Sequence, residues 1–321
     1  MTSIAKKVIS GDVRAVARLI RDIDDGIPEV REIMKELYSH TGKAYVIGIT
    51  GAPGVGKSTL VDQMVALIRA KGATVGVLAV DPTSPFTGGA ILGDRIRMQR
   101  HSMDDGVFIR SLATRGHFGG LTMSTRSAIN VLDAMGKDFI IVETVGVGQD
   151  EVDVVKNAHT TVIVVIPGMG DDIQAIKAGI LEVGDIFVIN KADREGVERT
   201  LSDLRLMIEM DQEKYREGKW KPPILKTEAI SGKGIKELLK EIERHREYLM
   251  SSGKGSAPGS RVLRIREELT EIIKGHLIGD VLERLVRCDE FEDAVDSILK
   301  GETDPYTACE KVLGKKVKIR I

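Results

Sequence analysis

The chain has 321 residues, of which 42% are hydrophobic and 30% are charged, a composition typical of folded globular proteins. Its 47 Lys and Arg residues nearly balance its 48 Asp and Glu residues, and the net charge of −1 argues against a protein that coats nucleic acid. The start of the chain lacks the apolar core of a signal peptide, and no apolar run is long enough to span a bilayer. We therefore expect a cytoplasmic protein that binds neither nucleic acid nor membranes.

The first forty residues have a helical pattern. Apolar residues recur at three- and four-residue steps from Val13 to Ile23 and again from Val30 to Leu37. The segment Gly26–Pro28 interrupts the pattern. The sequence predicts two helices here.

From residue 44 onward, short β-branched runs alternate with helical stretches. The runs are apolar throughout, as expected of strands that helices cover on both faces of a sheet. This alternation predicts an α/β fold with a mostly parallel sheet flanked by helices. The predicted strands are Tyr45–Thr50, Val75–Val80, Val107–Ser111, Phe139–Glu143, Thr161–Ile166, Ile186–Asn190 and Ile224–Thr227.

A flexible linker is predicted at Ser251–Ser260, where the sequence reads SSGKGSAPGS. The tail that follows is rich in helix formers, with Ile265, Leu269 and Ile273 on one side. We predict an N-terminal helical extension at 1–42, an α/β domain at 43–252 and a helical C-terminal arm at 253–321.

The segment GAPGVGKS, residues 51–58, matches the phosphate-loop pattern GxxxxGK[ST] in full. It follows the strand Tyr45–Thr50 and opens a helix, which is the context that the motif requires. The glycines let backbone N–H groups surround a phosphate, Lys57 would reach the β- and γ-phosphates, and Ser58 would bind Mg²⁺. The predicted phosphate-binding residues are Gly51, Ala52, Pro53, Gly54, Val55, Gly56, Lys57, Ser58 and Thr59.

The base is predicted from Asn190, Lys191 and Asp193, the NKxD pattern at the end of a later strand. A carboxylate can accept hydrogen bonds from both the ring N–H and the amino group of guanine, whereas adenine presents an acceptor at the equivalent ring position. The pattern therefore predicts bound GTP or GDP. The segment Glu228–Ile230 (with Ala229) fits a backbone loop over the base, and an ordinary strand-to-helix turn remains the alternative.

Acidic residues after the strands predict the magnesium and switch positions. Glu143 would hold Mg²⁺ together with Ser58, and the N–H of Gly146 would sense the γ-phosphate. Val147 stands where Ras-type enzymes have a water-orienting Gln, which predicts slow intrinsic hydrolysis.

Two further acidic residues, Asp81 and Asp94, are candidate metal or water-positioning groups. The alternative roles, in which Asp81 lies in a turn and Asp94 caps a helix, remain open. The predicted catalytic residues are Lys57, Asp81, Asp94 and Glu143. Arg95, Arg97 and Arg115 are candidate charge stabilisers, although an arginine in such a position is more often a surface ion-pair partner.

Taken together, these motifs resemble the ArgK/MeaB family of P-loop GTPases, the chaperones associated with methylmalonyl-CoA mutase. The resemblance runs through GAPGVGKST, DPTSPFTGGAILGDRIRM, ATRGHFGGL, ETVGVGQDEVDV, PGMGDDIQAIKAGILEVGDIFVINKAD and DPYTACEKVL. It implies a homodimer whose arm is Arg261–Ile321, and a partner that is an adenosylcobalamin-dependent mutase. It also implies that GTP hydrolysis times the loading of the mutase cofactor, with Gly168–Lys177 coupling nucleotide state to the partner.

The resemblance places the family's nucleotide site on residues 51–59, on Asn190, Lys191 and Asp193, and on Glu228–Ile230. Its acidic switch positions correspond to Asp81, Asp94 and Glu143. Two departures are evident, since Glu228 stands where the family usually has Ser, and Arg95-Ile96 stands where Lys-Thr is common.

Two alternative functions are less consistent with the sequence. An ATP-dependent kinase or ATPase linked to arginine and ornithine transport would share the phosphate loop, but Asn190–Asp193 disfavours it. A nickel-type metallochaperone GTPase would be expected to carry a His- or Cys-rich tract, and the six His and two Cys of this chain form none.

Overall fold

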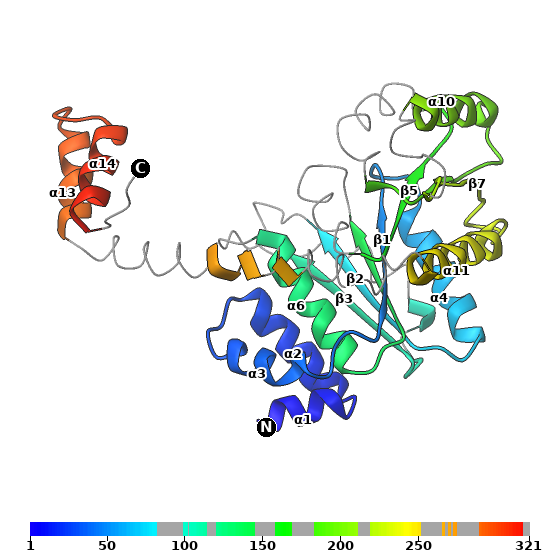
Figure 1. Cartoon of the computed structure of the whole chain (residues 1–321), viewed down its shortest axis with the longest axis horizontal. Helices are drawn as coiled ribbons and strands as arrows, with labels where there is room; N and C mark the ends of the chain where they lie inside the picture. The colour runs from blue at the N-terminus through cyan, green and yellow to red at the C-terminus, as the bar shows by residue number, and fades with distance from the viewer. Residues whose placement is uncertain are drawn as a thin grey trace. The chain divides into compact units, whose positions relative to one another are not determined.

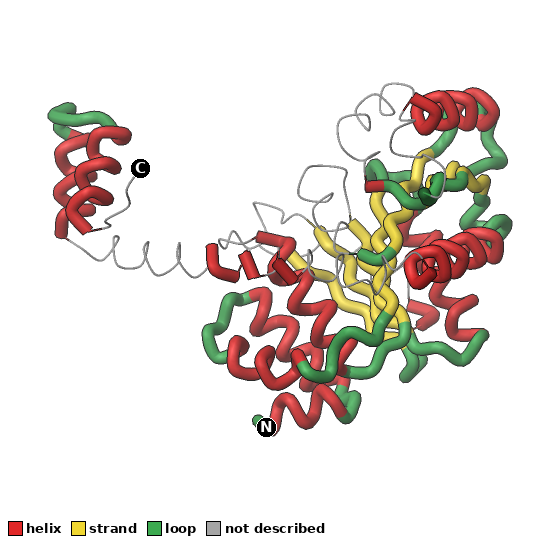
Figure 2. The backbone as a smooth tube through the Cα atoms, in the orientation of Figure 1, coloured by secondary structure: helices red, strands yellow, loops and turns green. Residues whose placement is uncertain are grey.

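A computed structural model describes residues 1–81, 99–101, 103–113, 120–144, 158–168, 183–210, 219–251, 265–266, 269–270, 272–274 and 289–316. The chain divides into two compact units, Met1–Arg264 and Ile265–Ile321. The first unit holds a seven-stranded sheet with helices on both faces (Figures 1 and 2). In the part of the chain that is described, no helix has the length and apolar character needed to cross a membrane.

The N-terminal region forms three helices, so the prediction of two was wrong. They are α1 (Ser3–Ile9), α2 (Val13–Asp24) and α3 (Val30–Tyr38). The missed helix, α1, is only 7 residues long, too short to establish a helical period, although Thr2 caps it by accepting a hydrogen bond from the N–H of Ala5. It ends before Gly11, whose φ of +83° lets the chain turn into α2.

The seven strands lie in the order β3-β2-β4-β1-β5-β6-β7, and every recorded ladder is parallel. The predicted α/β class is confirmed, and each predicted strand lies within two residues of the observed one. The strands are β1 (Tyr45–Thr50), β2 (Val75–Asp81), β3 (Val107–Ala113), β4 (Phe139–Thr144), β5 (Thr160–Val165), β6 (Ile186–Ile189) and β7 (Ile224–Lys226).

One face of the sheet is covered by α4 (Lys57–Ala70) and α11 (Ile235–Ser251). Ile47 and Ile49 of β1 and Ile141 of β4 point into this layer. Because side chains alternate along a strand, Glu143 faces the same side as Ile141. The start of α4 is therefore packed against the end of β4.

The opposite face is covered by α6 (Gly120–Ala134) together with the three N-terminal helices. Val46 of β1 and Ile140 and Val142 of β4 pack into this second layer. Toward the β7 edge the same face is covered by α10 (Val197–Met210), which packs on β5 and β6. The N-terminal helices thus belong to the same compact unit as the sheet.

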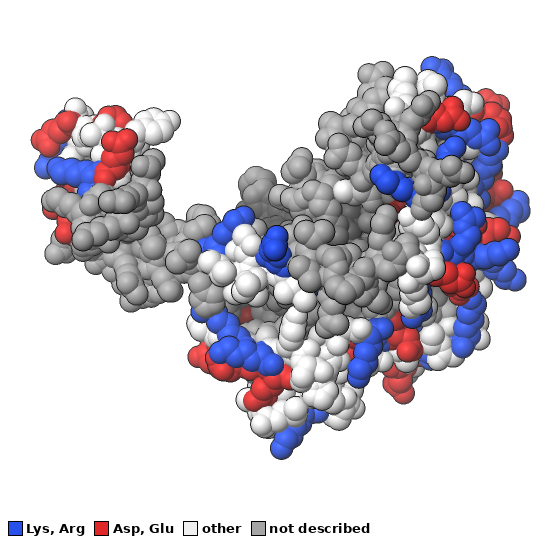
Figure 3. All heavy atoms as spheres, viewed as in Figure 1, with Lys and Arg blue, Asp and Glu red and all other residues white. Residues whose placement is uncertain are grey.

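The second unit contains α13 (Asp289–Leu299) and α14 (Pro305–Lys316), and Ala308 and Val312 of α14 are buried. On the face of the molecule drawn in Figure 3, described basic and acidic side chains are intermixed over the N-terminal helices and along α10 and α11. Ion pairs join Glu198 of α10 to Lys226 of β7, and Glu243 of α11 to Lys71 at the end of α4.

Candidate nucleotide-binding site

The loop between β1 and α4 depends on glycine at two positions. Gly51 has φ of +150°, and a Cβ there would lie 2.2 Å from the backbone oxygen of Val164 in β5. Gly56 has φ of +96°, and a Cβ there would lie 2.5 Å from Nδ2 of Asn190. Only a residue without a side chain fits at either point, so the loop lies tightly against the ends of β5 and β6.

The start of α4 lacks a side-chain cap. Its N-cap residue is Gly56, which has no side chain to accept a hydrogen bond from the first turn. By contrast, the side chain of Asp12 accepts bonds from two N–H groups at the start of α2. The first-turn N–H groups of α4, together with the positive end of the helix dipole, are suited to an anionic ligand.

Lys57 is buried and curls back over the loop. Its Nζ donates to the carbonyl oxygens of Gly51 at 2.6 Å and Ala52 at 3.0 Å. The ammonium group is thus held inside the loop that it follows, where it would meet a bound phosphate.

Ser58 and Glu143 are brought together from positions 85 residues apart. The Ser58 hydroxyl donates to Oε1 of Glu143 at 2.7 Å, and both side chains are buried. A hydroxyl and a carboxylate are the hard oxygen ligands that Mg²⁺ prefers, and Mg²⁺ at a phosphate loop takes its other ligands from phosphates and water. The pair therefore fits Mg²⁺, and no group of three or more His, Cys, Asp or Glu suited to a metal occurs among the described residues.

Asn190 joins the phosphate loop to the loop that follows β7. Its Nδ2 donates to the carbonyl oxygen of Val55 at 2.8 Å. Its Oδ1 accepts from the hydroxyl of Thr227 at 3.0 Å and from the N–H of Ala229 at 3.1 Å. Three segments distant in sequence are thereby held at one buried amide.

Lys191 adds a second link to the phosphate loop. It is the one non-glycine residue with a positive φ recorded among the described residues, at 55°, and its Nζ donates to the carbonyl oxygen of Gly54 at 2.7 Å. A lysine held in this left-handed conformation is uncommon, and such backbone strain is concentrated at functional sites.

The side chain of Glu228 is directed away from Asn190. It forms contacts of 3.0 Å with Ser231 and with Lys233, which hold the pKa of the Glu228 carboxyl below its usual value, Lys233 foremost. Only the backbone of this segment, through Ala229, faces Asn190. The Glu at a position where Ser is usual therefore leaves the backbone contact in place. Ile230 is 88% exposed next to it.

The remaining predicted residues have different positions in the structure. Asp193 is exposed two residues after Lys191, at the same edge of the sheet. Asp81 is the last residue of β2, and its side chain lies outside the described part of the structure. Asp94 and Gly146 lie outside the described residues altogether. The sequence did not single out Thr227 or the Val55 carbonyl as partners of Asn190, because no local pattern pairs residues 37 and 135 positions apart.

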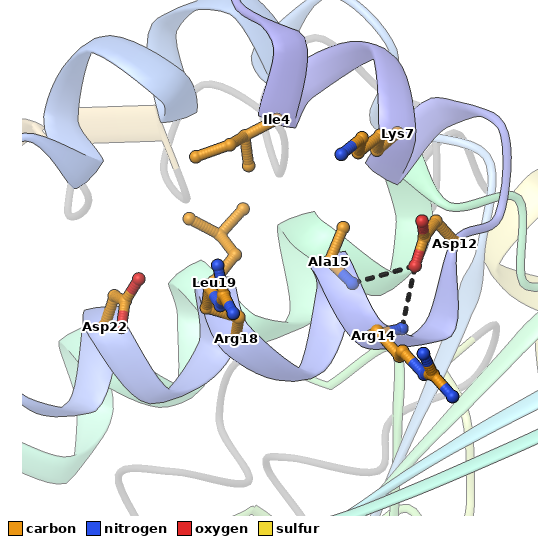
Figure 4. Close-up of a pocket in the computed structure, with 8 residues that line it drawn as sticks. All are labelled: Ile4, Lys7, Asp12, Arg14, Ala15, Arg18, Leu19 and Asp22. Carbon is orange, nitrogen blue, oxygen red and sulfur yellow. Dashed lines mark hydrogen bonds between the residues drawn. The ribbon is translucent and has the colours of Figure 1, made fainter.

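The recorded cavity lies elsewhere, between α1 and α2 (Figure 4). Its volume is about 240 Å³, and its lining includes Lys7, Arg18 and Leu19. These helices cover the face of the sheet opposite to α4, so this cavity is separate from the phosphate loop.

Comparison with known proteins identifies the family. A family model described as methylmalonyl-CoA mutase-associated GTPase MeaB matches residues 16–284. The chain belongs to the MeaB family of GTPases. The resemblance drawn from the motifs is thus confirmed, and GTP hydrolysis is the activity of the family.

Two MeaB-family relatives and one solved structure illustrate the similarity. A candidate GTPase of Pyrococcus abyssi is 52% identical over 310 residues, which cover 97% of this chain and 95% of that protein. A mouse protein named mitochondrial methylmalonic aciduria type A homolog is 35% identical over 218 residues, or 66% of this chain and 51% of that protein. A crystal structure described as an LAO/AO transport system kinase shares the fold, with a TM-score of 0.65 and 23% identity over 96% of this chain and 95% of that one.

Proposed function

We propose that this MeaB-family GTPase binds GTP, hydrolyses it to GDP and serves as a chaperone for an adenosylcobalamin-dependent mutase, with methylmalonyl-CoA mutase as the client. The nucleotide part is carried by one observation, the hydrogen bonds of Asn190 that join the phosphate loop to the backbone of Ala229. This junction fixes the spacing between a phosphate and a base. The client is supported by the family description and by the name of the mouse relative.

In this proposal the chain's own residues bind and orient the nucleotide. The backbone N–H groups of residues 51–59, all but Pro53, surround the β-phosphate. Lys57 moves from the carbonyls of Gly51 and Ala52 to the β- and γ-phosphate oxygens. Asp193 accepts from the guanine ring N–H and amino group. Ser58 and Glu143 would hold Mg²⁺, directly or through water, and the chemistry that such an ion would supply there is neutralisation of phosphate charge.

The catalytic roles of Asp81 and Asp94, and the contact of the Gly146 N–H with the γ-phosphate, remain part of the proposal. Asp81 would act at the same edge of the sheet as Glu143, because it ends β2 and β2 is adjacent and parallel to β4. With Val147 in place of a water-orienting Gln, intrinsic hydrolysis is expected to be slow, so that the GTP-bound state lasts long enough to report cofactor loading to a partner.

The tail from residue 253 is proposed as a homodimerisation arm. Among its described residues, Ile265, Leu269 and Ile273 are 41%, 55% and 47% exposed, which leaves apolar surface for a second copy to cover.

The client is tested by mixing the purified chain with a purified adenosylcobalamin-dependent methylmalonyl-CoA mutase and following complex formation by size-exclusion chromatography. A complex whose affinity differs between GDP and a non-hydrolysable GTP analogue is expected. With an ATP analogue, the affinity of the complex should equal that measured without any nucleotide. Absence of a complex in every nucleotide state would contradict the chaperone role while leaving GTP hydrolysis intact.

A further inference from the structure

A pair of buried threonines lies beside Glu143, on the other face of the sheet. The hydroxyl of Thr144 donates to Oγ1 of Thr50 at 2.9 Å, and neither side chain is accessible to solvent. Thr50 is the last residue of β1 and Thr144 the last of β4. No motif considered for nucleotide binding assigns a role to either hydroxyl.

The pair extends the contact between the two strands beyond their backbone ladder. The recorded register of β1 and β4 ends at Ile49 opposite Glu143. The Thr144–Thr50 bond joins the next residues of the two strands, directly before the phosphate loop on one side and the 145–150 segment on the other. It therefore ties β1 directly to β4 one residue beyond their recorded register, where Thr50 is otherwise registered only with Ile163 of β5 and Thr144 only with Val80 of β2.

Glu143 is held between two contacts on opposite faces of the sheet. On the α4 face its carboxylate accepts from Ser58, and on the α6 face the adjacent Thr144 is bonded to Thr50. Because consecutive residues of a strand point to opposite faces, fixing Thr144 fixes the direction in which the Glu143 side chain leaves the backbone.

We propose that Thr144, through its hydrogen bond to Thr50, is a positioning residue that holds Glu143 in the geometry needed to share Mg²⁺ with Ser58. This inference rests on the proposed nucleotide function and deepens it by naming a residue that tunes the metal site without touching the metal. Outer residues of this kind orient metal ligands, and their loss weakens metal affinity.

The test compares five variants of the full chain. Thr144→Val and Thr50→Val each remove the hydrogen bond from one side, the double variant combines them, and Thr144→Ser keeps a hydroxyl at position 144. The control is Thr125→Val, because Thr125 of α6 is equally buried and its hydroxyl has no hydrogen-bond partner among the described residues. The readouts are the dependence of the release rate of a fluorescent GDP analogue on Mg²⁺ concentration and the melting temperature.

Loss of one neutral hydrogen bond predicts that Thr144→Val raises the half-maximal Mg²⁺ concentration about five- to tenfold. Thr50→Val should match it, and the double variant should exceed neither single variant, because both act through one bond. Thr144→Ser should lie within about twofold of wild type, and Thr125→Val should leave the Mg²⁺ dependence unchanged.

A wild-type Mg²⁺ requirement in Thr144→Val overturns the inference, and so does an equal change in Thr125→Val, which would indicate loosened packing. Additive effects of the two single variants also overturn it. These outcomes differ from a failure of the proposed function, in which the wild-type chain itself would show no Mg²⁺-dependent retention of GDP and the inference would fall with it.

Discussion

Replacing Asn190 with alanine removes three hydrogen bonds at a side chain that is 2% exposed. They run to Val55, Thr227 and Ala229 at 2.8, 3.0 and 3.1 Å. Each neutral hydrogen bond contributes about 1 kcal/mol, and the buried groups left behind lose their partner, so the free energy of unfolding should fall by about 3 kcal/mol.

Urea denaturation measures this loss directly. The chain contains one tryptophan, Trp220, which lies in the first unit, so its fluorescence reports the unfolding of that unit alone. GDP affinity should also fall, by about a hundredfold, because ligand binding must then order both loops. The matched control is Asn130→Ala on α6, since Asn130 has no recorded hydrogen bond among the described residues, and it should change stability by less than about 0.5 kcal/mol. An Asn190→Ala variant as stable as this control would refute the reasoning.

Three other predictions follow from the structure. Burial lowers the pKa of His245 from 6.5 to about 4. As pH falls, the imidazole is therefore protonated in the unfolded chain before it is protonated in the folded chain. About 3 kcal/mol of the free energy of unfolding, fully present above pH 6.5, is lost as pH falls toward 4. Urea titrations at pH 7.5 and 4.5 should show that His245→Asn loses less stability between the two pH values than the wild type does. An equal loss would exclude His245 as the cause of the pH dependence. Lys57→Ala should lower kcat for GTP by at least about a hundredfold in a phosphate-release assay, with an unchanged circular dichroism spectrum; turnover near wild type would contradict the role of Lys57. Gly51→Ala would place a Cβ 2.2 Å from the Val164 oxygen, so it should abolish GDP binding in a titration, and normal affinity would show that the loop is not held as described.

Much of the fold could be predicted because its signals are local. Apolar β-branched runs such as Tyr45–Thr50 and Thr160–Val165 are the central strands of a sheet covered on both faces. The phosphate loop carries its own glycine pattern. The short helix α1 gave no such signal, because 7 residues do not complete two helical turns.

The contacts that organise the site could not be predicted in the same way. The pairs Ser58–Glu143 and Asn190–Val55 join residues 85 and 135 positions apart, and only the strand order brings them together. The NKxD motif predicted that Asn190 belongs to the nucleotide site. It did not predict that the side-chain amide of Asn190 would form hydrogen bonds to two loops.

A further polar network was missed entirely. His245 of α11 lies 2.9 Å from the Thr160 hydroxyl, which in turn lies 2.5 Å from the hydroxyl of Tyr45. Trp220 lies against the His245 ring, with centroids 4.6 Å apart. Tyr45 and Thr160 lie at the beginnings of β1 and β5, the edge of the sheet opposite to the phosphate loop, and no sequence pattern links them to His245 or Trp220.

The central claim is that the chain recognises guanine at Asn190–Asp193. Calorimetric titration of the Mg²⁺-loaded protein with GTP, ATP and xanthosine triphosphate tests it most directly, on the wild type and on Asp193→Asn. Wild type should prefer GTP over ATP by about 10⁴-fold, and the variant should lose GTP affinity while gaining affinity for the xanthosine nucleotide. Equal or tighter binding of ATP to wild type, or unchanged GTP binding by Asp193→Asn, would contradict the account.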